Sequence, residues 1–495
     1  MNSGKSCNYV KAYTPRLRYH EYLVSIEKES WTFVSFELPG CGVGNSVHFQ
    51  SLNIILAPIF MFYFRNFFSL SLLSSVILVP TLFSSDWPQW RGPDRDGTWK
   101  ESWIVSTFDS PNLKPTWSTP VGSGYSGPTV SDGRVYLTSR LEEPEQVEQV
   151  HCVDEKTGKE IWKYVYACKY QDIGYPLGPR AAVAISDGKA YALGAMGHFH
   201  CLDAITGKVI WKKSLIDDYQ VNTPIWGITA SPLVDDEHVY LQVGGEGEST
   251  MVAFDKDDGA EKWRSLDGLA SYSAPRFIEQ NGERLLLAWT GDWFAALNPS
   301  TGAPVWKHVF DRAKMAINVA DAVLDPETNR IFLSSFYDGS YLYQLNSDAL
   351  SSELLWERRG RSEIKTDALH SIISTSVIRG NYVYGIDSYG EFRCLDLTNG
   401  DRIWSDQSLL EKGRWATAFL VQNGDLTWIF TEKGDLIIAH LTPEGFERIS
   451  TTHIIEPTTF LPRRSGNILW SHPAYANKHI LVRNDRELVS VDLSQ

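Results

Sequence analysis

Cysteine is scarce in this chain, with six among 495 residues, no CxxC pair and no two adjacent cysteines. These spacings argue against zinc ribbons, c-type haem attachment and a dense disulfide scaffold. The basic residues are scattered and the formal net charge is -14, whereas phosphate binding needs clustered Lys and Arg. We therefore expect no nucleic-acid partner. GxSxG, Walker and HExxH motifs are missing as well, so no motif predicts a hydrolase or nucleotide site.

One segment near the start is strongly apolar. Arg65 precedes an apolar run from Phe67 to Phe83, and two serines follow. This layout predicts a secretory signal peptide over residues 61–85, with a retained membrane anchor as the alternative. Because Met61 stands where such a peptide begins, we expect residues 1–60 to be a mis-assigned or disordered extension. The protein would then be exported to the periplasm or cell envelope, and would meet the membrane only through an uncleaved segment.

A short phrase recurs along the rest of the chain. HCVDEKTGKEIW at residues 151–162 returns as HCLDAITGKVIW at residues 200–211. The pattern is a small residue, Asp or Asn two positions later, and then Gly and Trp four and eight positions after that. Its tryptophans, at intervals of 43 to 52 residues, are Trp162, Trp211, Trp263, Trp306, Trp356 and Trp404. The copy ending at Trp356 carries two extra residues, and in a later copy Ala439 and Ile449 take the places of the small residue and Trp.

Each copy closes a unit of four short strands. Two alternating apolar runs precede the phrase, as in AAVAISDGKAYALGA and PRFIEQNGERLLLAW. Their Asp-Gly and Asn-Gly centres supply the positive φ that tight hairpins require. Four strands every 40–50 residues is the spacing of a β-propeller blade. The sequence therefore predicts an all-β fold built from repeated four-stranded antiparallel blades.

The two ends of the repeat region complement each other. The last third strand, at residues 487–493, has no Trp after it because the chain stops at Gln495. Residues 114–121 form a fourth strand, with Trp117, that no other strands precede. We predict that this N-terminal strand completes the last blade and closes the ring, which removes its free edges. The prediction is an eight-bladed propeller over residues 113–495, preceded by an extended segment at residues 86–112.

The phrase itself is predicted to join neighbouring blades. A Trp on the outer strand buries a large apolar area over the next blade, and the small residue leaves room for that packing. Cys152, Cys201 and Cys394 occupy the small position, so we expect buried thiols there rather than ligands or nucleophiles. The GHFHC stretch places His198 and His200 beside Cys201, but an HxH pair is a weak signal and no metal site is predicted.

The repeat resembles the tryptophan-docking motif of the pyrroloquinoline-quinone-like (PQQ-like) β-propellers. The segments DWPQWRGPDRDGTW, WGITASPLV and CLDLTNGDRIW are similar to those of exported bacterial members, and the resemblance covers residues 86–495. The superfamily includes quinoprotein alcohol dehydrogenases and the propeller lipoprotein of the outer-membrane assembly machine. The dehydrogenases imply PQQ with calcium, a disulfide between adjacent cysteines and an Asp base. The adjacent cysteines are missing, and Asp321 is only an isolated candidate.

The segments that lead into the first strands are expected to surround the propeller axis. In such a ring the first strands line the axis, and the loops before them open on one face, where ligands bind. The candidate ligand-binding residues are Tyr125, Arg180, Trp226, Tyr272, Asp321, His370, Trp415 and His472. Packing of these residues as a channel plug is the alternative. The expected role is binding or scaffolding, for a protein, an envelope polymer or a small molecule. A PQQ-dependent oxidoreductase with an atypical site is the runner-up.

Overall fold

The computed structural model describes residues 23–26, 29–32 and 85–495. The chain divides into two units, Met1–Thr81 and Leu82–Gln495. In the first, β1 (Leu23–Ile26) and β2 (Glu29–Thr32) pair as an antiparallel hairpin. The predicted signal peptide at residues 61–85 and the rest of the 1–60 extension lie outside the described residues, apart from Ser85. Within the described ranges, no helical segment has the length and hydropathy of a membrane span.

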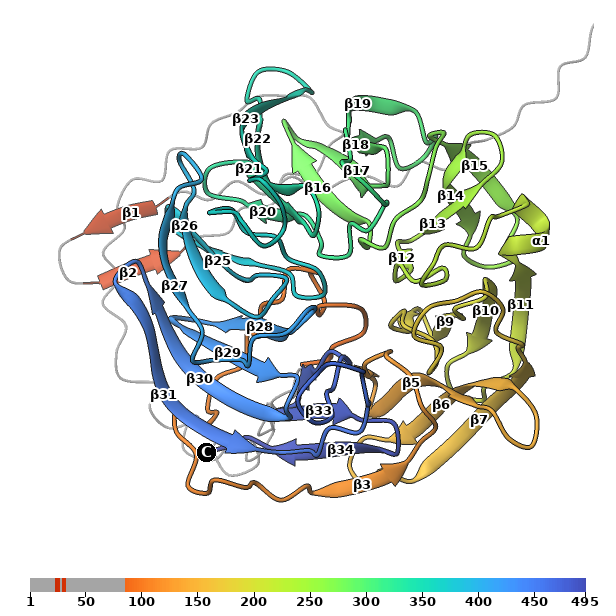
Figure 1. The fold of residues 1–495 in the computed structure, drawn as a ribbon. Coiled ribbons are helices and arrows are strands. Elements are labelled where there is room, and N and C mark those ends of the chain that lie inside the picture. The colour runs from red at the N-terminus through yellow and green to blue at the C-terminus, as the bar shows by residue number, and fades with distance from the viewer. Residues whose placement is uncertain (1–22, 27–28, 33–84) are drawn as a thin grey trace, which may run out of the picture. The chain divides into compact units, whose positions relative to one another are not determined.

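The second unit is a ring of eight four-stranded antiparallel sheets around a central axis (Figure 1). This confirms the predicted eight-bladed propeller. The first four blades are β4 (Thr129–Ser131), β5 (Arg134–Leu141), β6 (Val147–Asp154) and β7 (Glu160–Ala167); β8 (Ala184–Ser186), β9 (Lys189–Leu193), β10 (His198–Asp203) and β11 (Val209–Ser214); β12 (Leu233–Val234), β13 (His238–Gly245), β14 (Ser249–Asp255) and β15 (Glu261–Ser265); and β16 (Arg276–Gln280), β17 (Glu283–Trp289), β18 (Trp293–Leu297) and β19 (Pro304–Val309).

The next three blades follow the same order, and one short helix, α1 (Leu215–Tyr219), lies between the second and third blades. These three blades are β20 (Val323–Asp325), β21 (Arg330–Ser335), β22 (Gly339–Leu345) and β23 (Ser352–Arg358); β24 (Val377–Arg379), β25 (Tyr382–Ile386), β26 (Phe392–Asp396) and β27 (Arg402–Asp406); and β28 (Ala418–Asn423), β29 (Leu426–Thr431), β30 (Asp435–Thr442) and β31 (Gly445–His453).

The eighth blade is built from both ends of the repeat region. It joins β32 (Ala474–Ala476), β33 (His479–Arg483) and β34 (Glu487–Asp492) to β3 (Trp117–Pro120), in the order β3-β34-β33-β32. Trp117 lies opposite Ser490, the same pairing that places Trp162 opposite Cys152 within one blade. The predicted closure of the ring is therefore confirmed.

The outer tryptophans connect the blades by hydrogen bonds as well as by packing. Six of them donate the indole N–H to a backbone carbonyl of the next blade at 2.7–3.1 Å: Trp117, Trp162, Trp211, Trp263, Trp356 and Trp404. The seventh, Trp306, donates instead to the Gln280 side chain, which itself donates to carbonyls of the turn at residues 346–351. The two extra residues in that turn are thus bridged by one glutamine.

Where the phrase is intact, the small residue is buried as predicted. Cys152, Cys201 and Cys394 are buried and unpaired, and burial raises the pKa of each thiol to about 12. The Gly of the phrase is required by its surroundings. At Gly207, φ is +70° and a Cβ would lie 2.6 Å from the Trp162 ring, so any other residue would be strained and would clash.

The two degraded copies differ from the sequence alignment. Opposite Trp356 the structure places Leu342, in the strand before the turn. In the seventh blade the bulge falls between Ile438 and Ala439, so that Ser450 rather than Ile449 takes the place of Trp. The assignment of Ile449 was wrong because the position of the bulge depends on strand pairing, which the altered phrase no longer indicates.

The segment at residues 86–112 covers one end of the ring. Trp87 pairs with Val130 of the first blade and Thr98 with Gln422 of the seventh, while Arg95 donates to carbonyls of Ser231 and Pro275. Beyond the axis, Phe108 donates its N–H to Ser450, at the position that lacks a docking Trp. The segment therefore crosses the axis on the side of the turns between first and second strands.

Candidate ligand site at the axial mouth

One cavity of about 140 Å³ lies on the axis among the loops that lead into the first strands. Seven of the eight predicted residues line it: Tyr125, Arg180, Trp226, Tyr272, Asp321, Trp415 and His472. These residues come from seven different connections between blades, spread over almost 350 residues of sequence, and the ring brings them together. For comparison, a drug-sized ligand needs about 300–1,000 Å³, whereas a cavity of about 150 Å³ holds one benzene-sized molecule.

His370 does not line this cavity. Its side chain is fully buried, with Nδ1 2.9 Å from the Phe336 carbonyl oxygen and Nε2 3.1 Å from the Thr366 hydroxyl. Burial lowers the pKa of this imidazole. His370 lies in the long connection between β23 and β24, where strand periodicity does not determine which residue faces the axis.

Several lining residues were missed by the sequence reasoning. They are Trp90, Tyr175, Ile372, Ile373, Phe419 and Trp470, with smaller side chains between them. Tyr175 and Trp470 lie in the same entering segments as Arg180 and His472, so the aromatic character of these segments was a usable signal. Trp90 belongs to the N-terminal segment, which carries no repeat and gave no indication that it reaches the axis.

The mouth is formed by a connected set of aromatic rings. Trp415 contacts Tyr175, Trp226 and Trp470, with ring centroids 5.2, 5.6 and 6.4 Å apart. Trp226 in turn contacts Tyr272 at 5.2 Å. Such edge and tilted contacts contribute about 0.5–1.5 kcal/mol each beyond buried area. The rings therefore hold one another in place around the cavity without a repeated sequence motif.

Two indole N–H groups of this aromatic set have no hydrogen-bond partner. They belong to Trp415 and Trp470, and His472 Nε2 lacks a partner too. The His472 Nδ1 lies 3.3 Å from the Pro473 carbonyl oxygen, so the N–H is assigned to Nδ1 and Nε2 acts as an acceptor. Burial lowers the pKa of His472 to about 4, which keeps the ring neutral at pH 7. Buried polar atoms without partners are uncommon and call for an explanation.

The charged side chains at the cavity are already engaged. Arg180 donates to the carbonyls of Gly174, Tyr175 and Gly178 at 2.7–2.8 Å and lies over the Tyr125 ring. Burial lowers the pKa of its guanidinium and raises that of the Tyr125 hydroxyl. Arg180 therefore acts first as a clamp on its own loop.

Asp321 is the other charged residue of the cavity. It accepts hydrogen bonds from the Trp90 indole and from the Ala274 N–H. Burial lowers the pKa of Arg95 to about 9, while the Asp321 charge opposes that shift. The carboxylate thus fastens the N-terminal segment to the axis, where Trp90 forms part of the cavity wall.

The comparisons with known proteins agree with this architecture. The family described as "Outer membrane protein assembly factor BamB" matches residues 146–406, more than half of the chain. The chain belongs to this family. A search of curated proteins gave no match.

Solved structures show the same fold as this BamB-family chain at low identity. BamB from Moraxella catarrhalis has a TM-score of 0.53 and 15% identity, covering 77% of this chain and 99% of that one. Quinohemoprotein alcohol dehydrogenase from Comamonas testosteroni has a TM-score of 0.57 and 14% identity, covering 83% and 81%. Quinohemoprotein alcohol dehydrogenase ADHIIG from Pseudomonas putida HK5 has a TM-score of 0.56 and 12% identity, covering 83% and 80%. These likenesses concern the fold.

Because the fold is shared with quinoprotein dehydrogenases, PQQ is a possible cofactor, but the axial residues of this BamB-family member do not fit it. PQQ is a fused-ring quinone with several carboxylates, and the one cation lining the cavity, Arg180, is occupied by backbone carbonyls. Calcium prefers 6–8 oxygen ligands, yet Asp321 is the one carboxylate that lines the cavity. The four described cysteines are unpaired, so no disulfide within residues 85–495 lies against the cavity.

Proposed function

We propose that this protein is an exported binding protein of the cell envelope whose axial mouth docks a protein partner. An aromatic or bulky apolar side chain of the partner would enter the cavity. The size of the cavity, its ring of indole and phenol groups and its neutral histidine all suit a single uncharged ring. The apolar run at residues 67–83 and the name of the family, an outer membrane assembly factor, support export and a partner in the envelope.

The observation that carries the proposal is an apolar rim around the mouth. Five connections between blades, all on the face where the cavity opens, each expose one large apolar side chain. They are Ile225, Leu269, Met315, Ile364 and Phe460. Exposed apolar groups arranged around a cavity are typical of protein interaction sites, where a central anchor is surrounded by contacts that exclude water. An envelope polymer would require rows of hydrogen-bonding groups in place of this rim.

A selection from a random peptide display library, with the full-length protein as bait, tests this function. Selected peptides are expected to carry Trp, Phe, Tyr or Leu at one shared position. Trp415→Ala is expected to weaken their binding at least about tenfold, as for a central interface anchor, with an unchanged circular dichroism spectrum. Peptides without such a residue, or peptides indifferent to Trp415→Ala, would refute a partner-binding mouth.

The oxidoreductase alternative is tested by a separate titration. Titration of the protein with PQQ in the presence of calcium is expected to show no binding in the micromolar range. Saturable binding that Arg180→Ala abolishes, together with reduction of a dye by an alcohol or sugar, would replace the binding function with a dehydrogenase.

A further inference from the structure

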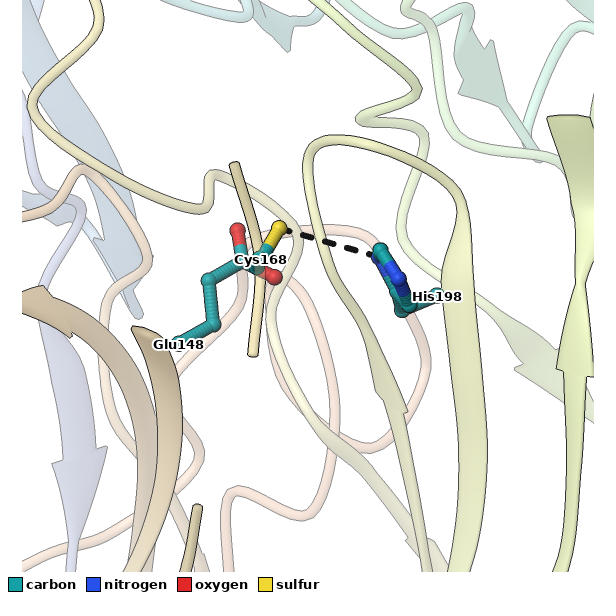
Figure 2. A group of neighbouring side chains, drawn as sticks. All are labelled: Glu148, Cys168 and His198. Atoms are coloured by element: carbon teal, nitrogen blue, oxygen red, sulfur yellow. Dashed lines mark hydrogen bonds between the residues drawn. The ribbon is translucent and has the colours of Figure 1, made fainter. Parts of the chain in front are cut away.

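Three side chains with metal-binding groups converge between the first two blades, and none of them lines the axial cavity. Glu148 lies in β6, Cys168 follows β7 and His198 begins β10 (Figure 2). One carboxylate oxygen, the thiol sulfur and one imidazole nitrogen all lie within 4.8 Å of one another. The first two residues belong to one blade and the third to the next, so a shared ligand would join the two sheets.

The distance between the sulfur and the imidazole nitrogen matches a tetrahedral metal centre. Zn²⁺ binds sulfur at about 2.3 Å and imidazole nitrogen at about 2.0–2.1 Å. At a tetrahedral angle these bond lengths place the two ligand atoms about 3.5 Å apart, and the Cys168 Sγ lies 3.6 Å from the His198 Nδ1. The same spacing suits a hydrogen bond between thiol and imidazole in the metal-free protein. Binding of the metal would therefore need little movement of either residue.

The charges of the cluster also suit a divalent cation. Glu148 and Cys168 are both completely buried, whereas His198 is half-buried. A bound divalent cation makes the thiolate the favoured form of a coordinating cysteine. One carboxylate and one thiolate then neutralise the two positive charges of the metal.

The carboxylate is held in position by donors outside the ligand set. Tyr166 donates its hydroxyl to Glu148 Oε2 at 2.6 Å, and Tyr170 and the Ala195 N–H donate to Oε1. Metal-binding carboxylates are commonly fixed in this way. Gly194 makes room for the group, since a Cβ there would lie 2.1 Å from Oε2. The nearby Arg140 charge is balanced by Glu142 at 2.7 Å.

We propose that Glu148, Cys168 and His198 form a site for a thiophilic divalent cation of the Zn²⁺ class. Three protein ligands leave the fourth tetrahedral position for water or an added ligand. The neighbouring groups of the GHFHC stretch do not take part. His200 stacks on the Tyr166 ring with centroids 4.3 Å apart, and Cys201 lies opposite Trp211 in the docking position. The site is independent of the function proposed for the axial mouth.

Cobalt titration of the full-length protein tests the site directly. Cys7 and Cys41 lie outside the described residues, so both are first replaced by Ser to leave the four buried thiols. After removal of metals with a chelator, Co²⁺ is expected to bind at one equivalent and to give a thiolate-to-cobalt charge-transfer band in the near ultraviolet. Addition of Zn²⁺ should abolish the band by displacement, because Zn²⁺ competes for the same ligands.

Variants assign the band to this cluster. Cys168→Ser is expected to abolish it, while His198→Ala and Glu148→Gln weaken Co²⁺ binding at least about tenfold. Cys394→Ser removes an equally buried thiol in the docking position of another blade and should leave the titration unchanged. Zn²⁺ is also expected to raise the melting temperature of the parent protein and not that of His198→Ala. A band that persists in Cys168→Ser, or the lack of any stoichiometric binding, would overturn the site and leave a hydrogen-bond cluster.

Discussion

The perimeter and the axis of this propeller both use tryptophan, but under different constraints. The seven docking tryptophans at the perimeter all donate their indole N–H to a defined acceptor, six of them to the backbone of the next blade. At the axis, Trp415 and Trp470 are held by packing against other rings and aliphatic side chains, and their indole N–H groups have no partner.

This difference distinguishes the tryptophans that stabilise the fold from the tryptophans proposed to bind a partner. A perimeter Trp repeats once in each blade, because every pair of neighbouring blades must be joined in the same way. An axial Trp is set by its own loop, and at the position of Trp470 the loops before β4 and β16 carry tyrosines, Tyr125 and Tyr272. We therefore expect substitutions at the perimeter to lower stability, and substitutions at the axis to change binding.

The largest effect on stability is expected when the side chain of one docking tryptophan is removed. Trp211→Ala removes a buried side chain and its hydrogen bond to the Lys256 carbonyl oxygen, which should lower the free energy of unfolding by about 3–5 kcal/mol. Trp103→Ala, at a residue that is 73% exposed, serves as the control and should change it by less than about 0.5 kcal/mol. Denaturant unfolding measures both variants. Equal small effects would show that the docking residues do not join the blades.

The pH dependence of stability tests the neutral histidine at the axis. His472 has a pKa of about 4 in the folded protein and about 6.5 when unfolded. The unfolded chain therefore takes up a proton first, and stability is lost as the pH falls from 6.5 to 4, by up to about 3 kcal/mol. His472→Gln should flatten this part of the profile of unfolding free energy against pH. An unchanged slope in the variant would mean that the loss of stability at low pH arises from other titrating groups.

A pair of glycines tests whether close packing against a docking tryptophan contributes to stability. Gly207 and Gly188 both have φ of +70°, but a Cβ would meet the Trp162 ring at Gly207 and nothing within 4 Å at Gly188. Gly188→Ala should cost about 1–2 kcal/mol from backbone strain. Gly207→Ala should cost more, since it also displaces the docked ring. If thermal unfolding shows equal losses of stability for the two variants, the close approach of Gly207 to the Trp162 ring contributes nothing to stability.

A matched pair of isoleucines tests the rim of the mouth. Ile225 on the mouth face is 45% exposed, and Ile210 on the outer strand of the second blade is 43% exposed. Ile225→Ala should weaken binding of a selected peptide about three- to tenfold, the range of a modest interface contact, and Ile210→Ala should not. Fluorescence anisotropy with a labelled peptide measures both. Similar losses would indicate a general apolar surface without a docking site.

Much of the fold was predictable because the repeated phrase encodes a local structure. Where the phrase is intact, the pairing of Cys201 with Trp211 follows from it, and the unmatched Trp117 predicted the closing strand. The prediction was wrong at Ile449, where the phrase is altered, because there the bulge is placed by packing between whole strands.

The candidate site was less predictable because it is made of loops. The order of strands shows which connections reach the axis, yet it does not show which residue of a long connection faces inward, as His370 illustrates. Trp90 enters from a segment without a repeat. Glu148, Cys168 and His198 are distant from one another in sequence, so only the packing of two blades reveals that cluster.

The most direct test of the difference between perimeter and axis is the indole N–H spectrum of the protein labelled with ¹⁵N-tryptophan. Trp415→Phe and Trp470→Phe assign the two axial signals, and a selected peptide is then titrated into the wild-type protein. The account predicts that these two signals shift with the binding curve while those of the docking tryptophans stay in place. Shifts confined to the docking tryptophans, or axial signals that do not move as the peptide binds, would contradict it.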